Sequence, residues 1–115
     1  QASRRARERE AEYMLLAAEA RREDARARAS GELGSAWSMY AQGRETLRLL
    51  AHTLLPQAQA TRDASRAALA SGTVDFDSVI EAERQLIDIR ARRLQTELET
   101  RLALAEIKKL TGELK

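Results

Sequence analysis

The sequence predicts an all-α fold, an antiparallel coiled-coil helical hairpin with one long helix and one shorter returning helix. Three observations support this prediction. Charged residues of both signs make up 33% of the 115 residues, which is typical of solvated helices. One proline and five glycines leave few places for turns. No stretch alternates β-branched or aromatic residues with polar ones, as a strand would. We expect residues 1–115 to form a single unit.

A long helix is expected over residues 1–70. Apolar side chains in its second half recur in steps of three, four and seven, the narrow stripe of a coiled-coil seam. They are Leu33, Trp37, Tyr40, Leu47, Ala51, Leu54 and Ala58. A weaker stripe precedes them and consists of Ala6, Tyr13, Leu16 and Ala20. If unbroken, about 70 residues that each rise 1.5 Å make a rod of roughly 105 Å.

Two places weaken this long helix. Gly31 and Gly34 each cost about 1 kcal/mol relative to alanine. Pro56 removes one backbone hydrogen bond and costs about 3 kcal/mol. Because the apolar stripe stays in phase across both places, we expect a continuous helix that bends near Pro56. Trp37 and Tyr40 are interpreted as packing anchors on the seam.

A turn is expected at residues 71–75, where the two helices meet. Gly72 fits the position after a helix that requires positive φ, and Asp75 or Asp77 fits the N-cap of the next helix. The returning helix is expected over 76–112, with Thr111 and Gly112 ending it. Its apolar stripe comprises Val79, Ala82, Leu86, Ile89, Leu94, Leu98, Leu102, Ala105, Ile107 and Leu110.

The two predicted arms differ in length, since the returning helix reaches about half way back along the first. Residues 1–30 therefore have no partner helix within the chain. Apolar side chains off the seam also need covering, among them Leu15, Leu16, Ile80, Ile87 and Leu104. We expect the chain to assemble with copies of itself or with another part of a larger protein. It opens on Gln rather than Met, so we expect a mature piece or a fragment.

Several function classes find no support in the sequence. The net charge is +2, and the basic stretches 4–9 and 21–28 are interrupted by acids without interleaved aromatics, so no nucleic-acid partner is expected. The absence of cysteine excludes disulfides and thiolate metal sites. His52, the sole histidine, has no histidine or carboxylate three or four positions away, so no metal site is expected there. No nucleophile lies beside a base and no phosphate-binding loop is present, so we expect neither an enzyme nor a cofactor. Apolar runs are shorter than the ~20 residues that span a membrane.

The segment around the turn resembles the periplasmic helix turn of TolC-like outer-membrane efflux proteins. Residues 72–82 read Gly-Thr-Val-Asp-Phe-Asp-Ser-Val-Ile-Glu-Ala, and Leu86 follows four residues on. The family has a helix end of small residues, a glycine, a short polar linker and then Val-Leu-Asp-Ala-x-x-x-Leu. Residues 54–58 and 101–112 also look like that family. The resemblance covers 33–112 well and 1–32 loosely, and it matches the second repeat of the family.

The resemblance implies that this chain is a fragment of a homotrimeric channel in a tripartite efflux system. The fragment would form part of the periplasmic tunnel of an outer-membrane protein that exports drugs, metal ions or proteins. Its partners would be a periplasmic adaptor and an inner-membrane transporter. The implied adaptor-docking tip consists of Leu69, Ser71, Gly72, Thr73 and Val74.

In TolC-like members, paired acids three residues apart line the closed end of the tunnel. Glu81 falls on the second of these positions, whereas the first falls on Ser78, with Asp77 adjacent. Asp77 and Glu81 are therefore candidate pore-lining acids. The alternative is that Asp75, Asp77 and Glu81 cap the helix and complement its dipole. The tyrosine and arginine that latch the closed tip in the family fall on Leu69 and Val74, so we expect that latch to be absent.

Two other functions remain open at the level of sequence. The chain could be the α-hairpin of a periplasmic adaptor, also called a membrane fusion protein. Such hairpins have arms of equal length between lipoyl-like β-segments, and the unequal arms here disfavour that assignment. The chain could also be a generic coiled-coil interaction module with no role in transport.

Overall fold

The computed structural model describes residues 1–114, so residue 115 of the predicted unit lies outside the described residues. Every element is helical: α1 spans Ala2–Leu49, the π-helix η1 spans Leu50–Leu54, α2 spans Leu55–Ala70 and α3 spans Phe76–Leu114. The prediction of an all-α fold with one long helix and a second helix is confirmed. No helix among residues 1–114 is long and apolar enough to cross a membrane.

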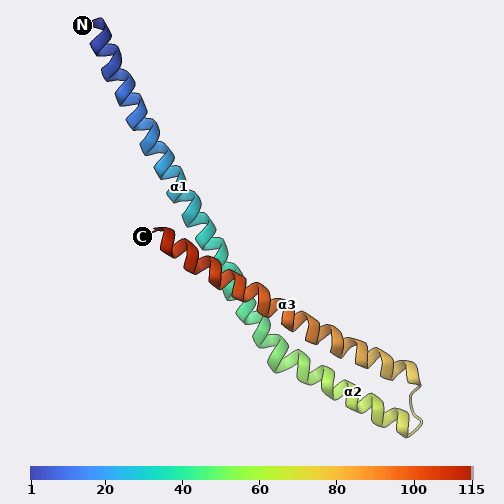
Figure 1. The fold of residues 1–115 in the computed structure, drawn as a ribbon. Helices are drawn as coiled ribbons and strands as arrows, with labels where there is room; N and C mark the ends of the chain where they lie inside the picture. Colours follow the sequence, from blue (N-terminus) through green and yellow to red (C-terminus); the bar gives the residue numbers. More distant parts are fainter. Residues whose placement is uncertain (115) are drawn as a thin grey trace.

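The elements α1, η1 and α2 follow one another without a break from Ala2 to Ala70. The helix passes through Gly31 and Gly34 and changes direction between α1 and α2, as Figure 1 shows. The prediction of a continuous helix that bends near Pro56 is confirmed. The molecule extends 101 Å along its longest axis. This extent agrees with a rod of roughly 105 Å that is slightly curved.

The bend coincides with the π-helix, and Pro56 explains its position. The backbone N–H of Leu55 donates to the carbonyl of Leu50, five residues earlier, instead of four. Pro56 has no N–H to donate, so an ordinary α-helical turn here would lack one hydrogen bond. The wider turn contains one residue more than an α-turn. It places Pro56 in the first turn of α2, where proline is tolerated.

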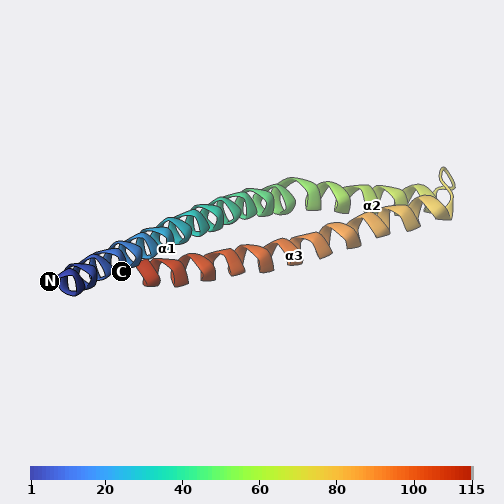
Figure 2. The same ribbon diagram turned by 90° about the horizontal axis from the view of Figure 1, so that it is seen from above.

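α3 packs against α2 and against the C-terminal part of α1, and Figures 1 and 2 show it alongside both. Residues 1–28 are all exposed and project beyond the end of α3. The predicted imbalance between the two arms is therefore present in the structure. α3 itself runs through Thr111 and Gly112 to Leu114, so the prediction that these two residues end it was wrong. A single exposed glycine costs a helix about 1 kcal/mol, which is too little to stop it.

The inward side of α3 follows a regular heptad. Buried or half-buried residues recur at alternating steps of three and four: Val79, Ala82, Leu86, Ile89, Arg93, Thr96, Thr100, Ala103, Ile107 and Leu110. The predicted stripe agrees at both ends, from Val79 to Ile89 and at Ile107 and Leu110. It is wrong between them, because Leu94, Leu98, Leu102 and Ala105 are exposed. These three leucines form a second apolar face on the outer side of α3. Hydrophobicity alone did not separate the two faces.

The inward side of the long helix differs from the predicted seam at two points. Ala36 is 4% exposed and Trp37 is 51% exposed, so the seam contains the alanine and not the tryptophan. Leu50 is buried, whereas its neighbour Ala51 is only half-buried. In both cases the residue that faces α3 is the one directly before the predicted residue. The interpretation of Trp37 as a seam anchor was therefore wrong, although its ring packs edge-on against Tyr40, with centroids 6.0 Å apart.

The π-helix also corrects the phase of this seam. From Ala29 to Leu50 the inward residues alternate in steps of four and three, and from Ala58 to Leu69 they do so again. From Leu50 through Leu54 to Ala58 the inward residues are separated by two successive steps of four. A heptad would have one step of four and one of three, so this part of the helix has one extra residue. The extra residue of the π-turn absorbs this difference. The same side of the helix therefore faces α3 before and after the bend.

Candidate functional site

The turn at residues 71–75 ends α2 with backbone hydrogen bonds from Ser71, Gly72 and Thr73. The N–H of Gly72 donates to the carbonyl of Leu69, and the N–H of Thr73 donates to the carbonyl of Ala68, at 3.0 and 2.9 Å. This pair of bonds is the Schellman motif, which requires a left-handed residue after the helix. Gly72 supplies it with a φ of 78°, as the sequence predicted.

Two hydroxyl groups reinforce the same helix end. Ser71 Oγ and Thr73 Oγ1 both donate to the carbonyl of Ala68, at 3.1 and 3.0 Å, and the two hydroxyl oxygens lie 3.1 Å apart. The side chains of Ser71 and Thr73 are nevertheless exposed. The tip therefore presents hydroxyl groups whose positions are set by the end of α2.

Asp75 caps the start of α3. Its Oδ1 accepts hydrogen bonds from the backbone N–H and the hydroxyl of Ser78, at 3.1 and 3.0 Å. This is the N-cap arrangement that satisfies an otherwise unpaired donor of the first helical turn. Of the two N-cap candidates, the structure assigns Asp75. Asp77 lies in the first turn, where the helix dipole favours a negative charge.

The other residues predicted for the tip lie close together but differ in exposure. Leu69 and Val74 are half-buried, and Asp77 and Glu81 are exposed on the first turns of α3. Phe76, the first residue of α3, is 63% exposed. Sequence reasoning treated Phe76 only as a helix start and missed it as a surface feature. The available signal was that the only phenylalanine of the chain stands directly after the turn.

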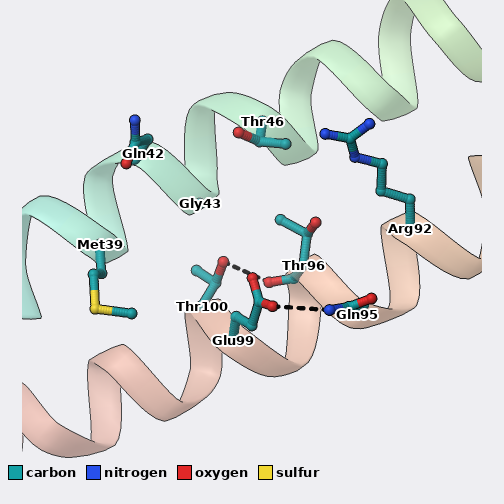
Figure 3. A pocket seen from close by; sticks show the side chains of 9 residues that line it. All are labelled: Met39, Gln42, Gly43, Thr46, Arg92, Gln95, Thr96, Glu99 and Thr100. Atoms are coloured by element: carbon teal, nitrogen blue, oxygen red, sulfur yellow. Dashed lines mark hydrogen bonds between the residues drawn. The ribbon is translucent and has the colours of Figure 1, made fainter.

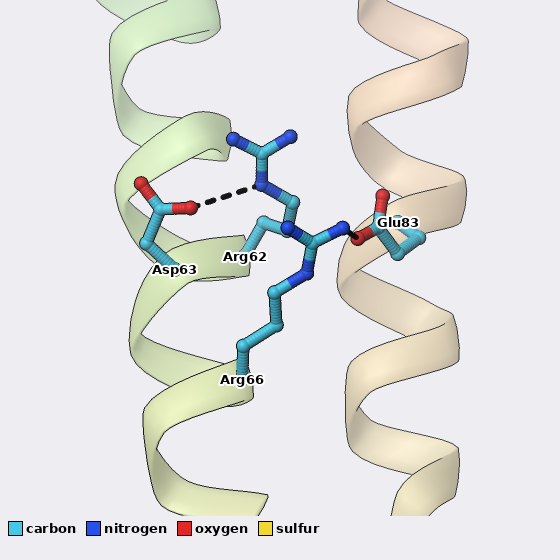
Figure 4. A network of polar contacts seen from close by, with 4 residues as sticks. All are labelled: Arg62, Asp63, Arg66 and Glu83. Atoms are coloured by element: carbon cyan, nitrogen blue, oxygen red, sulfur yellow. Dashed lines mark hydrogen bonds and ion pairs between the residues drawn. The ribbon is translucent and has the colours of Figure 1, made fainter.

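An ion pair between α2 and α3 lies about two helical turns or less from the tip. The guanidinium of Arg66 contacts the carboxylate of Glu83 at 2.5 Å. One turn earlier on α2, Arg62 pairs with its neighbour Asp63 at 3.0 Å (Figure 4). Arg66 and Glu83 remain partly exposed, so their pair contributes at most about 1 kcal/mol. Its main effect is to fix which residues of α2 and α3 lie opposite each other near the tip.

Halfway along the seam, α1 and α3 come close together through small and polar residues. Figure 3 shows Gly43 of α1 opposite Thr96 and Thr100 of α3. Both threonines are buried, and the hydroxyl of Thr100 donates to the carbonyl of Thr96 at 2.7 Å. Beside them lies a polar groove of about 370 Å³, whose lining includes Arg92 and Glu99. This polar stretch was not foreseen, because the seam was expected to be apolar throughout.

His52 and the acidic residues do not converge on a common centre. His52 is exposed in the π-helix. Among residues 1–114, no group of three or more histidine, aspartate or glutamate side chains is arranged to hold a metal ion. The candidate functional surfaces are therefore the turn at residues 71–75 and the exposed faces of the helices.

Comparisons of the chain with protein-family models, with curated proteins and with solved structures give no match. The resemblance described above consequently depends on the residues at 54–58, 72–86 and 101–112 alone. It assigns no family to the chain.

Proposed function

We propose that the chain is an antiparallel coiled-coil hairpin whose tip docks a periplasmic adaptor and whose arms form part of the periplasmic tunnel of a TolC-like outer-membrane channel. The observation that supports this most directly is the ordered, exposed turn at 71–75, which stands at one end of two arms of unequal length. The proposed role is non-catalytic and uses no cofactor.

The geometry of the turn favours docking. Its backbone is held by the Schellman bonds, its hydroxyls are held by the carbonyl of Ala68, and α3 begins at once from the cap at Asp75. A surface whose shape is fixed before binding loses little conformational entropy when a partner arrives. Thr73 and Phe76, three residues apart in the sequence, supply exposed polar and aromatic area at the tip. Such area suits a partner that is itself a helical tip.

The arms favour incorporation into a larger helical assembly. Residues 1–28 have no helix beside them, yet they carry exposed Tyr13, Met14, Leu15 and Leu16. α3 carries the outer apolar face of Leu94, Leu98 and Leu102 in addition to its seam. A helix with two apolar faces is suited to packing between two neighbours. In the proposed tunnel, other helices of the channel would supply the second neighbour, and the intact channel would be a homotrimer that works with an inner-membrane transporter.

Asp77 and Glu81 would then stand near the closed end of the tunnel. Both are exposed, whereas Asp75 is occupied as the N-cap. We propose that Asp77 and Glu81 face the pore and attract cations. In the intact channel in a planar bilayer, the double change Asp77→Asn and Glu81→Gln should lower the preference for cations over anions. An unchanged ion selectivity would remove these two residues from the pore.

The docking proposal is tested by disulfide trapping in intact cells that contain the full-length protein. The chain has no cysteine, so Thr73→Cys introduces a single reactive position at the tip. Cysteines in the hairpin tips of the cell's periplasmic adaptors should then give a disulfide-linked heterodimer. The matched control is Gln57→Cys, an exposed position in the first turn of α2 and far from the tip, which should give no product.

Two outcomes would contradict the assignment. If Thr73→Cys gives no heterodimer with any adaptor tip, the tip does not dock an adaptor. If the trapped partner is instead an outer-membrane channel, the chain is the hairpin of an adaptor. Trapping through Gln57→Cys alone would place the contact on the side of the helices and favour a generic coiled-coil module.

A further inference from the structure

A second groove lies between α1 and α3 near the end of α3, away from the docking tip, and it shares only Leu102 with the outer apolar face of α3. It has a volume of about 770 Å³, within the range of pockets that hold small organic ligands. Residues 28–39 of α1 form one wall and residues 99–106 of α3 form the other. These ranges correspond to about 16 Å and about 10 Å of helix. The groove is therefore compact rather than a long furrow.

The floor of this groove is apolar. Ala36 and Ala103 are buried at its base, and the small size of their side chains leaves room between the two helices. Met39 and Leu102 are exposed along its walls. Burial of an apolar ligand surface against such side chains removes that surface from water, which favours binding. Met39 also has a flexible side chain that adapts to ligands of different shape.

The rim of the groove is acidic. Glu32 stands on α1, and Glu99 and Glu106 stand on α3. Within the described residues no ion pair joins any of these three carboxylates to a basic group, and Arg28 is the one basic residue of the lining. The rim therefore has a net charge of about −2 at neutral pH. Low-dielectric walls concentrate the field of such charges within the groove.

We propose that this groove binds an amphiphilic organic cation, with the apolar body on Ala36, Met39 and Leu102 and the positive charge between Glu32, Glu99 and Glu106. The acidic rim selects the sign of the ligand charge, and the compact apolar floor selects a small hydrophobic body. An anion of the same shape would meet the net negative charge and be repelled. The groove would bind such a cation whether or not the tip docks an adaptor.

The test compares tetraphenylphosphonium with tetraphenylborate, two ions of nearly equal shape and opposite charge, by isothermal titration calorimetry at low salt. The phosphonium should bind at least tenfold more tightly than the borate. Methyl NMR locates the site, because the chain has two methionines, Met14 and Met39. The signal of Met39 should shift on binding, whereas that of Met14, on the projecting part of α1, should not.

Variants separate the groove from non-specific adsorption. The triple change Glu32→Gln, Glu99→Gln and Glu106→Gln should weaken phosphonium binding about tenfold, since each partly exposed charge pair is worth roughly a factor of two to three. The matched control, Glu8→Gln, Glu12→Gln and Glu19→Gln, removes the same charge from residues 1–28 and should leave the affinity unchanged. Ser35→Trp, at an exposed position of the lining, should block the groove, with circular dichroism confirming the helical content.

The proposal is overturned if the two ions bind with equal affinity, if the rim variant binds the phosphonium as tightly as the control variant does, or if the signal of Met14 moves together with that of Met39. Absence of binding by the phosphonium would overturn it as well. None of these outcomes bears on disulfide trapping at Thr73, so the two proposals fail independently.

Discussion

Gly43 on α1 lies so close to Thr100 on α3 that no methyl group fits between them. A Cβ on Gly43 would collide with the hydroxyl oxygen of Thr100 and would lie 3.1 Å from its Cβ. Thr100 cannot move outward freely, because it is buried and its hydroxyl is bonded to the carbonyl of Thr96. The absence of a side chain at position 43 therefore sets the distance between the two helices at the middle of the seam.

Gly43→Ala is expected to destabilise the paired helices. The added methyl overpacks the seam, at a cost of about 1–3 kcal/mol, whereas the better helix propensity of alanine returns up to about 1 kcal/mol. We expect a net loss of about 1–2 kcal/mol in urea unfolding, followed by the fluorescence of Trp37. In the background of Thr100→Ala, which removes the colliding oxygen, the loss should be smaller.

Gly34→Ala is the matched control for that experiment. Nothing lies within 4 Å of a Cβ added at Gly34, so only the helix propensity changes. This variant should be more stable than the parent by about 0.5–1 kcal/mol. If Gly43→Ala also stabilises the protein, the close approach at Thr100 does not limit the packing of the two helices.

Asp75→Ala should cost about 1 kcal/mol, because the N–H of Ser78 loses its acceptor. Asp75→Asn keeps an oxygen in place and should cost a few tenths of that amount. The control is Asp77→Ala in the same turn, which loses only its interaction with the helix dipole and should cost less than half as much as Asp75→Ala. Thermal unfolding by circular dichroism measures the three variants, and equal losses for Asp75→Ala and Asp77→Ala would contradict the capping role.

Deletion of Pro56 should preserve or raise stability. It removes the residue that disfavours an α-turn, and it also removes the one extra residue that separates Leu54 from Ala58 in the heptad. A straight α-helix would then present one unbroken stripe to α3, with a gain of up to about 3 kcal/mol.

The control for the proline deletion is removal of Ala41, an exposed residue where no π-turn compensates. That deletion rotates Leu33, Ala36 and Tyr40 by about 100° away from α3, so it should cost several kcal/mol. Urea unfolding with Trp37 fluorescence compares the two. If removing Pro56 proves as damaging as removing Ala41, the π-turn does not correct the phase of the seam.

Small-angle scattering of the dilute chain should give a radius of gyration near the 27.7 Å of the structure and a largest dimension near 101 Å. The helix has to pass unbroken through Gly31 and Gly34 for this length to be reached. A chain that folded back near Gly31 would extend only about 60 Å. A largest dimension in that range would contradict the long helix.

The features foreseen from sequence are those with a local cause. Gly72 follows from the requirement for positive φ after a helix, and Asp75 was one of two carboxylates able to cap α3. The bend near Pro56 follows from its missing N–H. In each case the neighbours along the chain determine the structure, so no knowledge of the partner helix is needed.

The features not foreseen depend on how two helices fit together. Trp37, Leu94 and Leu98 are more hydrophobic than Ala36, Thr96 and Thr100, yet the smaller residues occupy the seam. Threonine is tolerated there because its hydroxyl bonds within its own helix, as Thr100 does with Thr96. α3 has two apolar faces, and the more hydrophobic of the two in its middle is not the one that packs against α1. The apolar groove with an acidic rim arises from residues of both helices and was likewise absent from any local pattern.

Residues 1–28 have a thermodynamic consequence for the isolated chain. A helix in water without tertiary contacts is marginal, because its stability comes from propensity alone. The projecting part of α1 should therefore fray and lose its helicity at lower temperature than the segment beside α3, which is held by packing. The melting of the chain would then comprise two transitions rather than one, and a single melting temperature would not describe it. A neighbouring helix packed along residues 1–28 would stabilise them and merge the two transitions. A single cooperative melting transition would therefore indicate that the chain has assembled with a partner helix.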